Sequence, residues 1–304
     1  MTVAEYVAHR IHQPGRDYPE TNCYTDTLVE LLHSRGLEPL AMLGHLVRTD
    51  FEGDQLTFFK PPQGDLETLF GVDVHEMQPV GALPDQMAAQ VAHGRSMTAE
   101  LDAFFLPDTA ATDYRANHVK TTIAVDAIDP GGERLRYFHN QGRHELSGAD
   151  FRGIFRLDGA PDEVLPPYLE LVRFDGPPAA DARAVARGLL AHHLAYRPLD
   201  NPFGRFGSRL EADLPRLLEG SSEDFHAYAF ATVRMAGAAF ELLQAHCEWL
   251  LDERVDALDR IVEGAKVLSF RLARRRAFDP GPAVAGMAAA WQEAMDVLER
   301  ATPA

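Results

Sequence analysis

The chain has little cysteine, no long apolar run and no excess of basic charge. Its 304 residues include only two cysteines, Cys23 and Cys247. They lie in segments of different character, so we expect no disulfide framework and a reducing compartment. No stretch approaches the roughly 18 apolar residues of a membrane span, and the N-terminus lacks the basic and apolar regions of a signal peptide. We therefore expect a cytoplasmic protein that has no contact with a membrane.

The shortage of basic charge is greatest in the first part of the chain. Residues 1–175 hold 28 acidic and 14 basic side chains (net −14), and the remaining residues hold 18 and 15 (net −3), for a formal net charge of −17. A nucleic-acid-binding surface needs a basic footprint, so we do not expect nucleic acid as a partner. Hydrophobic residues at 46% and charged residues at 25% are typical of a globular protein, and the length suits two ordinary domains or one large one.

The pattern of side chains predicts two parts of different structure. Residues 118–128 and 134–139 alternate as strands do and are joined by the turn Asp129-Pro130-Gly131-Gly132. Further strands are predicted at 40–46, 55–59 and 96–106. After Gly176-Pro177-Pro178 the sequence predicts helices at 182–195, 207–218, 223–251, 255–275 and 282–300, with Ser221 and Asp224 as a capping box.

Three residues suggest nucleophilic chemistry. Cys23 lies where an irregular segment gives way to helical periodicity, and the unpaired N–H groups of a first helical turn favour a thiolate. His118 begins the clearest predicted strand, and Asn140 follows the next one. A cysteine at a helix start, a histidine on a strand and a carboxamide on the neighbouring strand form the papain-type arrangement. Cys247 lies in an apolar helical pattern and is expected to be a core residue.

Several strings along the chain resemble a bacterial family designated as a domain of unknown function. The resemblance covers nearly the whole chain, and members often accompany amino-acid:carrier-protein ligases, which implies aminoacyl thioesters as substrates. The matching strings are Asn22-Cys23-Tyr24, Asp50-Phe51-Glu52-Gly53-Asp54-Gln55, Thr57-Phe58-Phe59-Lys60-Pro61-Pro62, Asp102-Ala103-Phe104-Phe105-Leu106-Pro107-Asp108, Tyr137-Phe138-His139-Asn140-Gln141-Gly142, Leu165-Pro166-Pro167-Tyr168 and Pro198-Leu199-Asp200-Asn201-Pro202.

More distantly, residues 18–155 are similar to the N-terminal domain of the butirosin-pathway acyltransferase and to the papain-like peptidases of bacteriocin exporters. This resemblance implies a papain-like domain over residues 1–175, with an N-terminal helix on an antiparallel sheet. Together with the helical pattern of the later residues, it gives an expected α+β fold in which an all-helical bundle domain follows over 180–304. It also implies that Cys23 is the nucleophile, that His118 is the base and that Asn140 orients the imidazole.

The residues that would hold the substrate are less uniform. Papain-like enzymes carry a Gln six residues before the Cys to complete the oxyanion hole, and here that position is Asp17. A carboxylate cannot donate a hydrogen bond unless it is protonated, so either Asn22, Gln13 or the backbone N–H of Cys23 serves instead, or the oxyanion hole is unconventional. Asp102 is either a group that binds the substrate's amine or a carboxylate bonded to a nearby backbone group or Arg. The same alternatives hold for the remaining candidates, Tyr114 and Asp126.

The preferred function is therefore aminoacyl transfer from a carrier-protein phosphopantetheine thioester, through an acyl-Cys23 enzyme, to a small amine acceptor. The alternatives are a cysteine hydrolase (thioesterase, amidase or peptidase) and a non-catalytic module that binds the carrier protein. The basic cluster Arg271, Arg274, Arg275 and Arg276 either docks the acidic carrier protein or is a solvated helix end. We expect no metal site and no cofactor other than the phosphopantetheine that the carrier delivers.

Overall fold

The contacts within the chain divide it into two units. The computed structural model describes residues 6–159 and 165–302. The first unit comprises Met1–Pro14, Asn22–Pro39 and Leu66–Ala179, and the second comprises Gly15–Thr21, Leu40–Asp65 and Ala180–Ala304. We call them the sheet unit and the helical unit. Together they make an α+β protein, as the sequence predicts.

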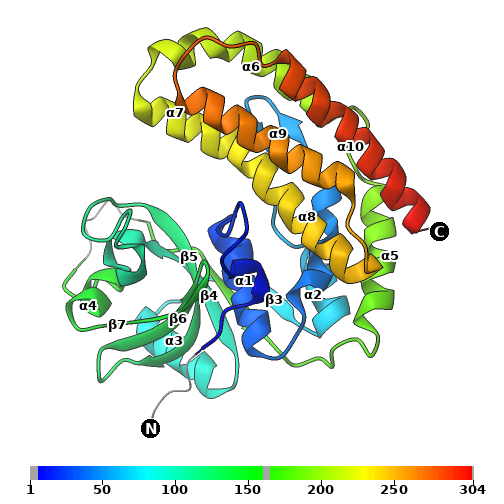
Figure 1. Cartoon of the computed structure of the whole chain (residues 1–304). Helices are drawn as coiled ribbons and strands as arrows, with labels where there is room; N and C mark the ends of the chain where they lie inside the picture. The colour runs from blue at the N-terminus through cyan, green and yellow to red at the C-terminus, as the bar shows by residue number, and fades with distance from the viewer. Residues whose placement is uncertain (1–5, 160–164, 303–304) are drawn as a thin grey trace. The chain divides into compact units, whose positions relative to one another are not determined.

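The sheet unit is built on a six-stranded antiparallel sheet in the order β3-β8-β4-β5-β6-β7 (Figure 1). Its strands are β3 (Asp73–Met77), β4 (Ser96–Asp102), β5 (Lys120–Asp129), β6 (Arg134–His139), β7 (Gly142–Ser147) and β8 (Leu169–Arg173). Its helices include α1 (Cys23–Ser34), α3 (Leu83–Ala92) and α4 (Ala149–Ile154). The predicted hairpin of β5 and β6 is confirmed, and Asp129 accepts a hydrogen bond from the Gly132 N–H in its turn (3.0 Å).

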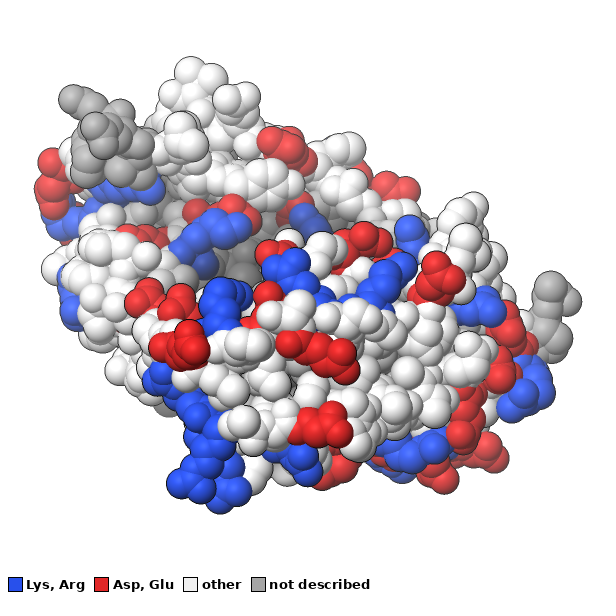
Figure 2. All heavy atoms as spheres, turned by 90° about the horizontal axis from the view of Figure 1, so that it is seen from above, with Lys and Arg blue, Asp and Glu red and all other residues white. Residues whose placement is uncertain are grey.

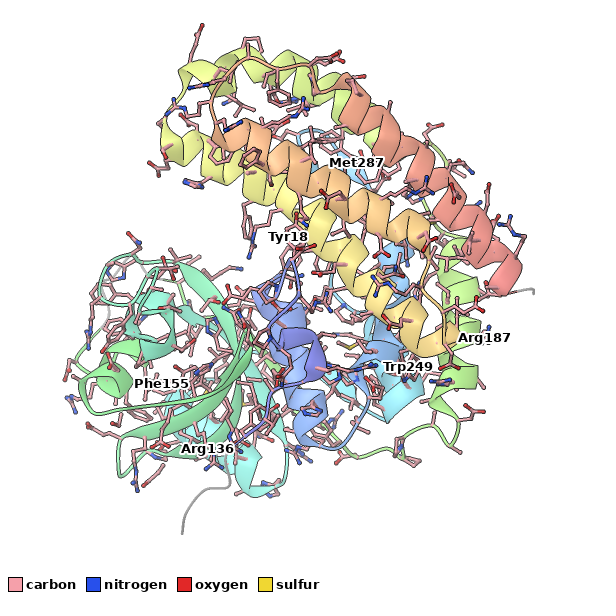
Figure 3. The ribbon with its side chains drawn as sticks, in the orientation of Figure 1. Tyr18, Arg136, Phe155, Arg187, Trp249 and Met287 are labelled. Carbon is pink, nitrogen blue, oxygen red and sulfur yellow. The ribbon has the colours of Figure 1, made fainter. Side chains whose placement is uncertain are left out.

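Both faces of β5 are covered, so residues 121–125 are all buried. On one face, α1 packs against the strand, and the Thr27 hydroxyl donates to the Thr122 carbonyl (3.1 Å). On the other face, Ile123 and Val125 join a core with Met87 of α3 and Phe151 of α4. Figure 3 labels Phe155, which belongs to this second core. Successive side chains of a strand point to opposite faces, so Thr122 and Ala124 face α1; beyond them the strand has a register shift between Val125 and Ala127, and Ile128 packs against the second core.

The helical unit contains six α-helices among its described residues: α5 (Ala182–Leu194), α6 (Pro202–Glu219), α7 (Ser222–Ala229), α8 (Met235–Leu251), α9 (Asp256–Ala273) and α10 (Gly281–Ala301). The predicted capping box is confirmed, because Ser221 accepts from the Asp224 N–H and Asp224 accepts from the Ser221 N–H. The single helix predicted over 223–251 is interrupted by a π-helical turn at Phe230–Arg234. The apolar faces of these helices pack on each other and bury Cys247.

One predicted strand is wrong. Residues 40–46 form part of a 3-10 helix over Pro39–Arg48, and almost all its side chains are buried. The short strands that follow are β1 (Phe51–Glu52) and β2 (Gln55–Leu56), and α2 (Gln63–Phe70) comes next. Over the described residues, no helix combines the length and the apolar character needed to cross a membrane.

Candidate functional site

Cys23 is the first residue of α1. Asn22 caps the helix in an extended conformation, and its side-chain oxygen accepts from the Thr25 N–H (2.9 Å). This is the side-chain capping that the Asn-Cys-Tyr-Thr sequence allows, because Asn is among the best N-cap residues. Cys23 is half-buried, whereas Cys247 is fully buried. Of the two thiols, only Cys23 therefore combines partial exposure with a helix N-terminus.

The sulfur of Cys23 rests on the sheet. Its Sγ lies 3.7 Å from the Thr122 hydroxyl oxygen, and the thiol donates to it. Thr122 also holds the next turn of α1 through its carbonyl, which accepts from Thr27. Thr122 thus contacts both the first residue and the second turn of α1, and it fixes the position of the start of this helix on the sheet.

His118 lies just before β5 and is paired with a carboxylate. Its Nδ1 is 2.6 Å from Asp102 Oδ2, and its ring stacks on Phe104 at 4.4 Å between centroids with an interplanar angle of 12°. A carboxylate accepts, so Nδ1 carries the proton and the lone pair of the neutral imidazole is on Nε2. The side chain of His118 is 69% exposed. His118 is therefore an exposed base whose ring is oriented by the Asp102 carboxylate.

The strand register places these groups in a row on the α1 face of the sheet. Thr122 pairs with Glu100, and Lys120 pairs with Asp102. Lys120 and Glu100 form an ion pair (2.7 Å) between the Cys23 contact and His118. Four residues of extended chain span about 13 Å, so Cys23 and His118 are at neighbouring but separate positions. In this conformation the thiol is bonded to Thr122 and the imidazole to Asp102.

Asn140 lies just beyond the end of β6 and is not the residue bonded to His118 Nδ1. It occupies the tight turn between β6 and β7 with φ 46°, a conformation that Asn tolerates better than most residues. Among the described residues, the hydrogen-bond partner of His118 is Asp102, so the pairing of His118 with Asn140 that the resemblance implied is not formed. A local reason is that Asp102 ends the strand directly beside β5, where it faces Lys120.

The other candidate side chains are engaged in local contacts. The Gln13 amide donates to the Ala8 carbonyl (3.0 Å), and the Tyr114 hydroxyl donates to Asp150 (3.0 Å). Asp126 accepts from Nε of Arg136 (2.5 Å), which is labelled on β6 in Figure 3. Asp17 belongs to the helical unit, where its carboxylate pairs with Lys266 (3.1 Å). None of these contacts reaches Cys23.

A buried acid–base cluster lies under α1 and is not predicted from the sequence. His12 hydrogen-bonds to Glu30 through Nδ1, and its Nε2 lies 3.4 Å from Asp26, with all three side chains at most 1% exposed. Tyr6 donates to Glu30 (2.5 Å). Burial alone would lower the pKa of His12, but the hydrogen bonds to Asp26 and Glu30 raise it to about 9. Two acids four residues apart on an otherwise apolar helix were the signal that could have revealed this cluster.

A second buried chain of hydrogen bonds, formed by Asp108, His139 and Thr121, holds the segment between β4 and β5 that precedes His118. His139 Nδ1 is 2.5 Å from Asp108, and its Nε2 is 2.8 Å from the Thr121 hydroxyl. Burial would raise the pKa of Asp108, but the hydrogen bond and charge of His139 lower it overall. Because Asp108 lies between β4 and β5, this contact ties the segment carrying Phe104 to the sheet.

The basic cluster lies at the end of α9 in the helical unit. Arg271, Arg274 and Arg276 line a pocket of about 720 Å³ together with Phe270 and Phe278. Arg274 packs over Phe270, and none of the three guanidinium groups has a carboxylate partner among the described residues. On the face of the molecule shown in Figure 2, Lys and Arg side chains are mixed with Asp and Glu. Arg275 instead donates to the Gly220 carbonyl.

No group of three or more His, Cys, Asp or Glu side chains in residues 6–159 and 165–302 has the geometry of a metal site.

In comparisons with known proteins, residues 7–174 match the DUF1839 N-terminal domain, and residues 179–300 match the DUF1839 C-terminal domain. No curated protein matches the chain.

Proposed function

We propose that this chain, which belongs to the DUF1839 family, is a cysteine-dependent acyltransferase that moves an aminoacyl group from a carrier-protein thioester to an amine. One observation carries the proposal. The half-buried Cys23 thiol contacts Thr122 of β5, and the His118–Asp102 pair lies further along the same face of the sheet, at the start of that strand. A helix-start cysteine and a histidine leading into a strand are also the elements of a papain-like centre.

In the first step, the Cys23 sulfur attacks the carbonyl carbon of the thioester. The Cys23 backbone N–H is one of the unpaired donors of a first helical turn and stabilises the oxyanion. The bond between the carbonyl carbon and the pantetheine sulfur then breaks. The proton that Cys23 gave up passes through His118 Nε2 to the departing thiolate, so the products are an acyl-Cys23 enzyme and a free pantetheine thiol.

In the second step, the amine attacks the acyl-Cys23 carbonyl. His118 takes the proton that the amine loses and returns it to the Cys23 thiolate as the C–S bond breaks. Asp102 accepts from the Nδ1–H, so Nε2 is the nitrogen that takes up and returns the proton in both steps. To reach the sulfur, His118 has to turn away from the Phe104 ring, and the exposure of its side chain leaves it free to do so.

The carrier protein would dock on the basic cluster of the helical unit. Arg271, Arg274 and Arg276, which have no carboxylate partner in the described part of the chain, suit an acidic partner, and the rest of the chain is strongly acidic. Attraction between exposed charges is screened by salt, so docking would weaken as the ionic strength rises.

The test is detection by intact mass of an aminoacyl adduct after mixing the protein with a loaded carrier protein. We expect one adduct, on Cys23, that disappears when an amine is added and forms more slowly at raised salt. Cys23→Ala should abolish it. Cys247→Ala is the matched control and should leave it unchanged, because burial raises the pKa of the Cys247 thiol to about 12.

The outcomes separate the three hypotheses. Loss of the adduct to water at the same rate with and without amines would make the protein a hydrolase. Absence of any adduct, with the carrier still bound, would make it a binding module and would overturn the proposal.

A further inference from the structure

An ion pair lies on the sheet beside the Cys23 sulfur. Thr122, whose hydroxyl contacts that sulfur, lies directly opposite Glu100 on the neighbouring strand β4 (Figure 1). Directly opposed residues of antiparallel strands point their side chains to the same face, with Cβ atoms about 5 Å apart. Glu100 therefore lies on the face that carries α1, one position across the sheet from the residue that Cys23 touches. All three residues belong to the sheet unit.

Glu100 already holds a primary ammonium group. The Lys120 Nζ donates to Glu100 Oε1 (2.7 Å), and the Lys120 side chain is 67% exposed, whereas that of Glu100 is 28% exposed. The backbone of Glu100 is fixed, because its N–H donates to the Tyr168 carbonyl (2.9 Å) and its strand pairs with β5 on the other side. An exposed ion pair adds little stability, so Lys120 leaves at small cost. The arrangement is a fixed carboxylate whose bound ammonium is easily exchanged.

An aminoacyl group on Cys23 brings the same kind of cation to the same place. Its ammonium is separated from the sulfur by the carbonyl carbon and one or two further carbon atoms, which span roughly 4–5 Å. That reach is comparable with the spacing of opposed side chains on β4 and β5. Asp102, the candidate for this role in the sequence, is instead bonded to His118 and to the Phe104 N–H.

The amine acceptor does not suit a position beside Glu100. An amine attacks through its lone pair, so it has to be neutral, and a neighbouring carboxylate favours the protonated form. The ammonium of the donor, by contrast, takes no part in the bonds that form and break, and it stays charged throughout. A carboxylate at this position therefore favours recognition of the donor.

We propose that Glu100 selects aminoacyl donors by binding their ammonium group in exchange for that of Lys120. This inference rests on the proposed acyl transfer at Cys23, and it names the residue that distinguishes an aminoacyl thioester from a simple acyl thioester. Glu100 exchanges no proton with the reacting atoms, so its effect is on which donor reacts.

The first experiment tests the carboxylate without acyl transfer. 2-Aminoethyl and methyl methanethiosulfonate both convert the Cys23 thiolate into a mixed disulfide and release methanesulfinate, but only the first carries an ammonium. The ratio of the two rates, followed by peptide mass mapping, is independent of the thiolate fraction, because that fraction enters both rates equally. We expect Glu100→Gln to lower the ratio roughly fivefold. Glu145→Gln is the matched control and should leave it unchanged, because it removes the same charge from β7, at the edge of the same sheet.

Lys120→Met tests the exchange. Removing the bound ammonium leaves Glu100 free, so the ratio should rise roughly fivefold. The gain should be much smaller when Glu100→Gln is also present, because no carboxylate is then released. Equal gains in the two backgrounds would mean that both charges act only through the general field, and this would overturn the exchange.

The second experiment uses thioesters, with no amine present. Alanyl and propionyl N-acetylcysteamine thioesters differ only in the ammonium, and dividing each rate of Cys23 loading by the rate with a small free thiol removes their intrinsic difference in reactivity. We expect a corrected preference for the alanyl group of roughly tenfold, most of which Glu100→Gln removes.

The outcomes separate this inference from the proposed function. An alanyl preference that survives Glu100→Gln would overturn the role of Glu100 and leave acyl transfer standing. An effect of Glu100→Gln confined to the later reaction with an amine would place the acceptor there and overturn the assignment to the donor. If neither thioester loads Cys23, acyl transfer fails and the donor assignment fails with it, while the thiosulfonate ratio still decides whether Glu100 binds an ammonium beside the thiol.

Discussion

Asp102 decides which nitrogen of His118 is basic. The carboxylate is held in place by a second hydrogen bond, from the Phe104 N–H (3.0 Å), so it cannot easily turn away. If His118 is the base of acyl transfer, Asp102→Asn should slow the reaction of acyl-Cys23 with an amine by about tenfold or more, because an amide no longer fixes the tautomer. Single-turnover decay of the adduct measures this rate.

Asn140→Gly is the matched control for that experiment. Glycine tolerates the positive φ of this turn, so the fold should survive and the rate should stay within about twofold. Asp102→Glu should recover part of the rate, which a merely structural role would not produce. If Asn140→Gly slowed the reaction and Asp102→Asn did not, Asn140 would be the orienting group after all.

At the residue scale, the sequence predicted where the thiol of Cys23 lies but not which residue is the hydrogen-bond partner of His118. Cys23 lies at a helix start as predicted, because its cap and the apolar periodicity that follows are local features. The partner of His118 depends on which strands are neighbours, and that is set by pairing between β4 and β5, whose partnered residues are about 20 positions apart. Local pattern does not contain this information.

The stability of α1 depends on a cation buried beneath it. His12 has its pKa raised to about 9 by Asp26 and Glu30, above the value of about 6.5 of an unfolded chain. Its contribution to stability is therefore complete below pH 6.5 and is lost as the pH rises through 9. It is on the order of 3 kcal/mol.

We therefore expect the sheet unit to lose stability between pH 7 and 10. Hydrogen exchange of the α1 amides, which are protected in the folded helix, measures it at each pH after correction for the intrinsic rate. His93, which is exposed, supplies a control: His93→Asn should leave the pH dependence unchanged. A protection of α1 that is constant across this range would contradict the assignment of a charged His12.

At the element scale, alternation of polar and apolar residues and capping signals predicted the secondary structure correctly, whereas a run of apolar residues did not. β5 and β6 were predicted because their polar and apolar residues alternate, and the helix start after Ser221 was predicted because Ser221 and Asp224 have the spacing of a capping box. The segment 40–46 is apolar almost throughout, and a short apolar run does not distinguish a strand from a buried helical turn. Its true structure depends on its surroundings in the helical unit.

For the whole molecule, composition predicted the change from a sheet-containing part to a helical part, but not how the chain is divided. The helical unit also takes in residues 15–21 and 40–65, which lie before most of the sheet in the sequence. Asp17 is therefore in a different unit from Cys23, although the two are six residues apart. The sequence placed Asp17 at the oxyanion hole because it is six residues before Cys23. That assignment assumes that the two residues belong to one unit, and they do not.

This division predicts opposite responses to pH in the two units. In the helical unit, burial lowers the pKa values of His45 and His246 to about 4, below the unfolded value of about 6.5. The unfolded chain then binds more protons, so the helical unit loses stability as the pH falls from 6.5 to 4, by on the order of 3 kcal/mol for each histidine. The sheet unit responds at alkaline pH instead.

Tryptophan fluorescence can isolate the acid response, because both tryptophans, Trp249 and Trp291, belong to the helical unit. We expect the urea midpoint followed by fluorescence to fall between pH 6.5 and 4.5. His246→Asn should reduce the fall, since an amide can donate to the Leu40 carbonyl in place of Nδ1 and does not titrate. A midpoint that is unchanged over this range, or equally pH-dependent in His246→Asn, would show that the buried histidines are not the cause.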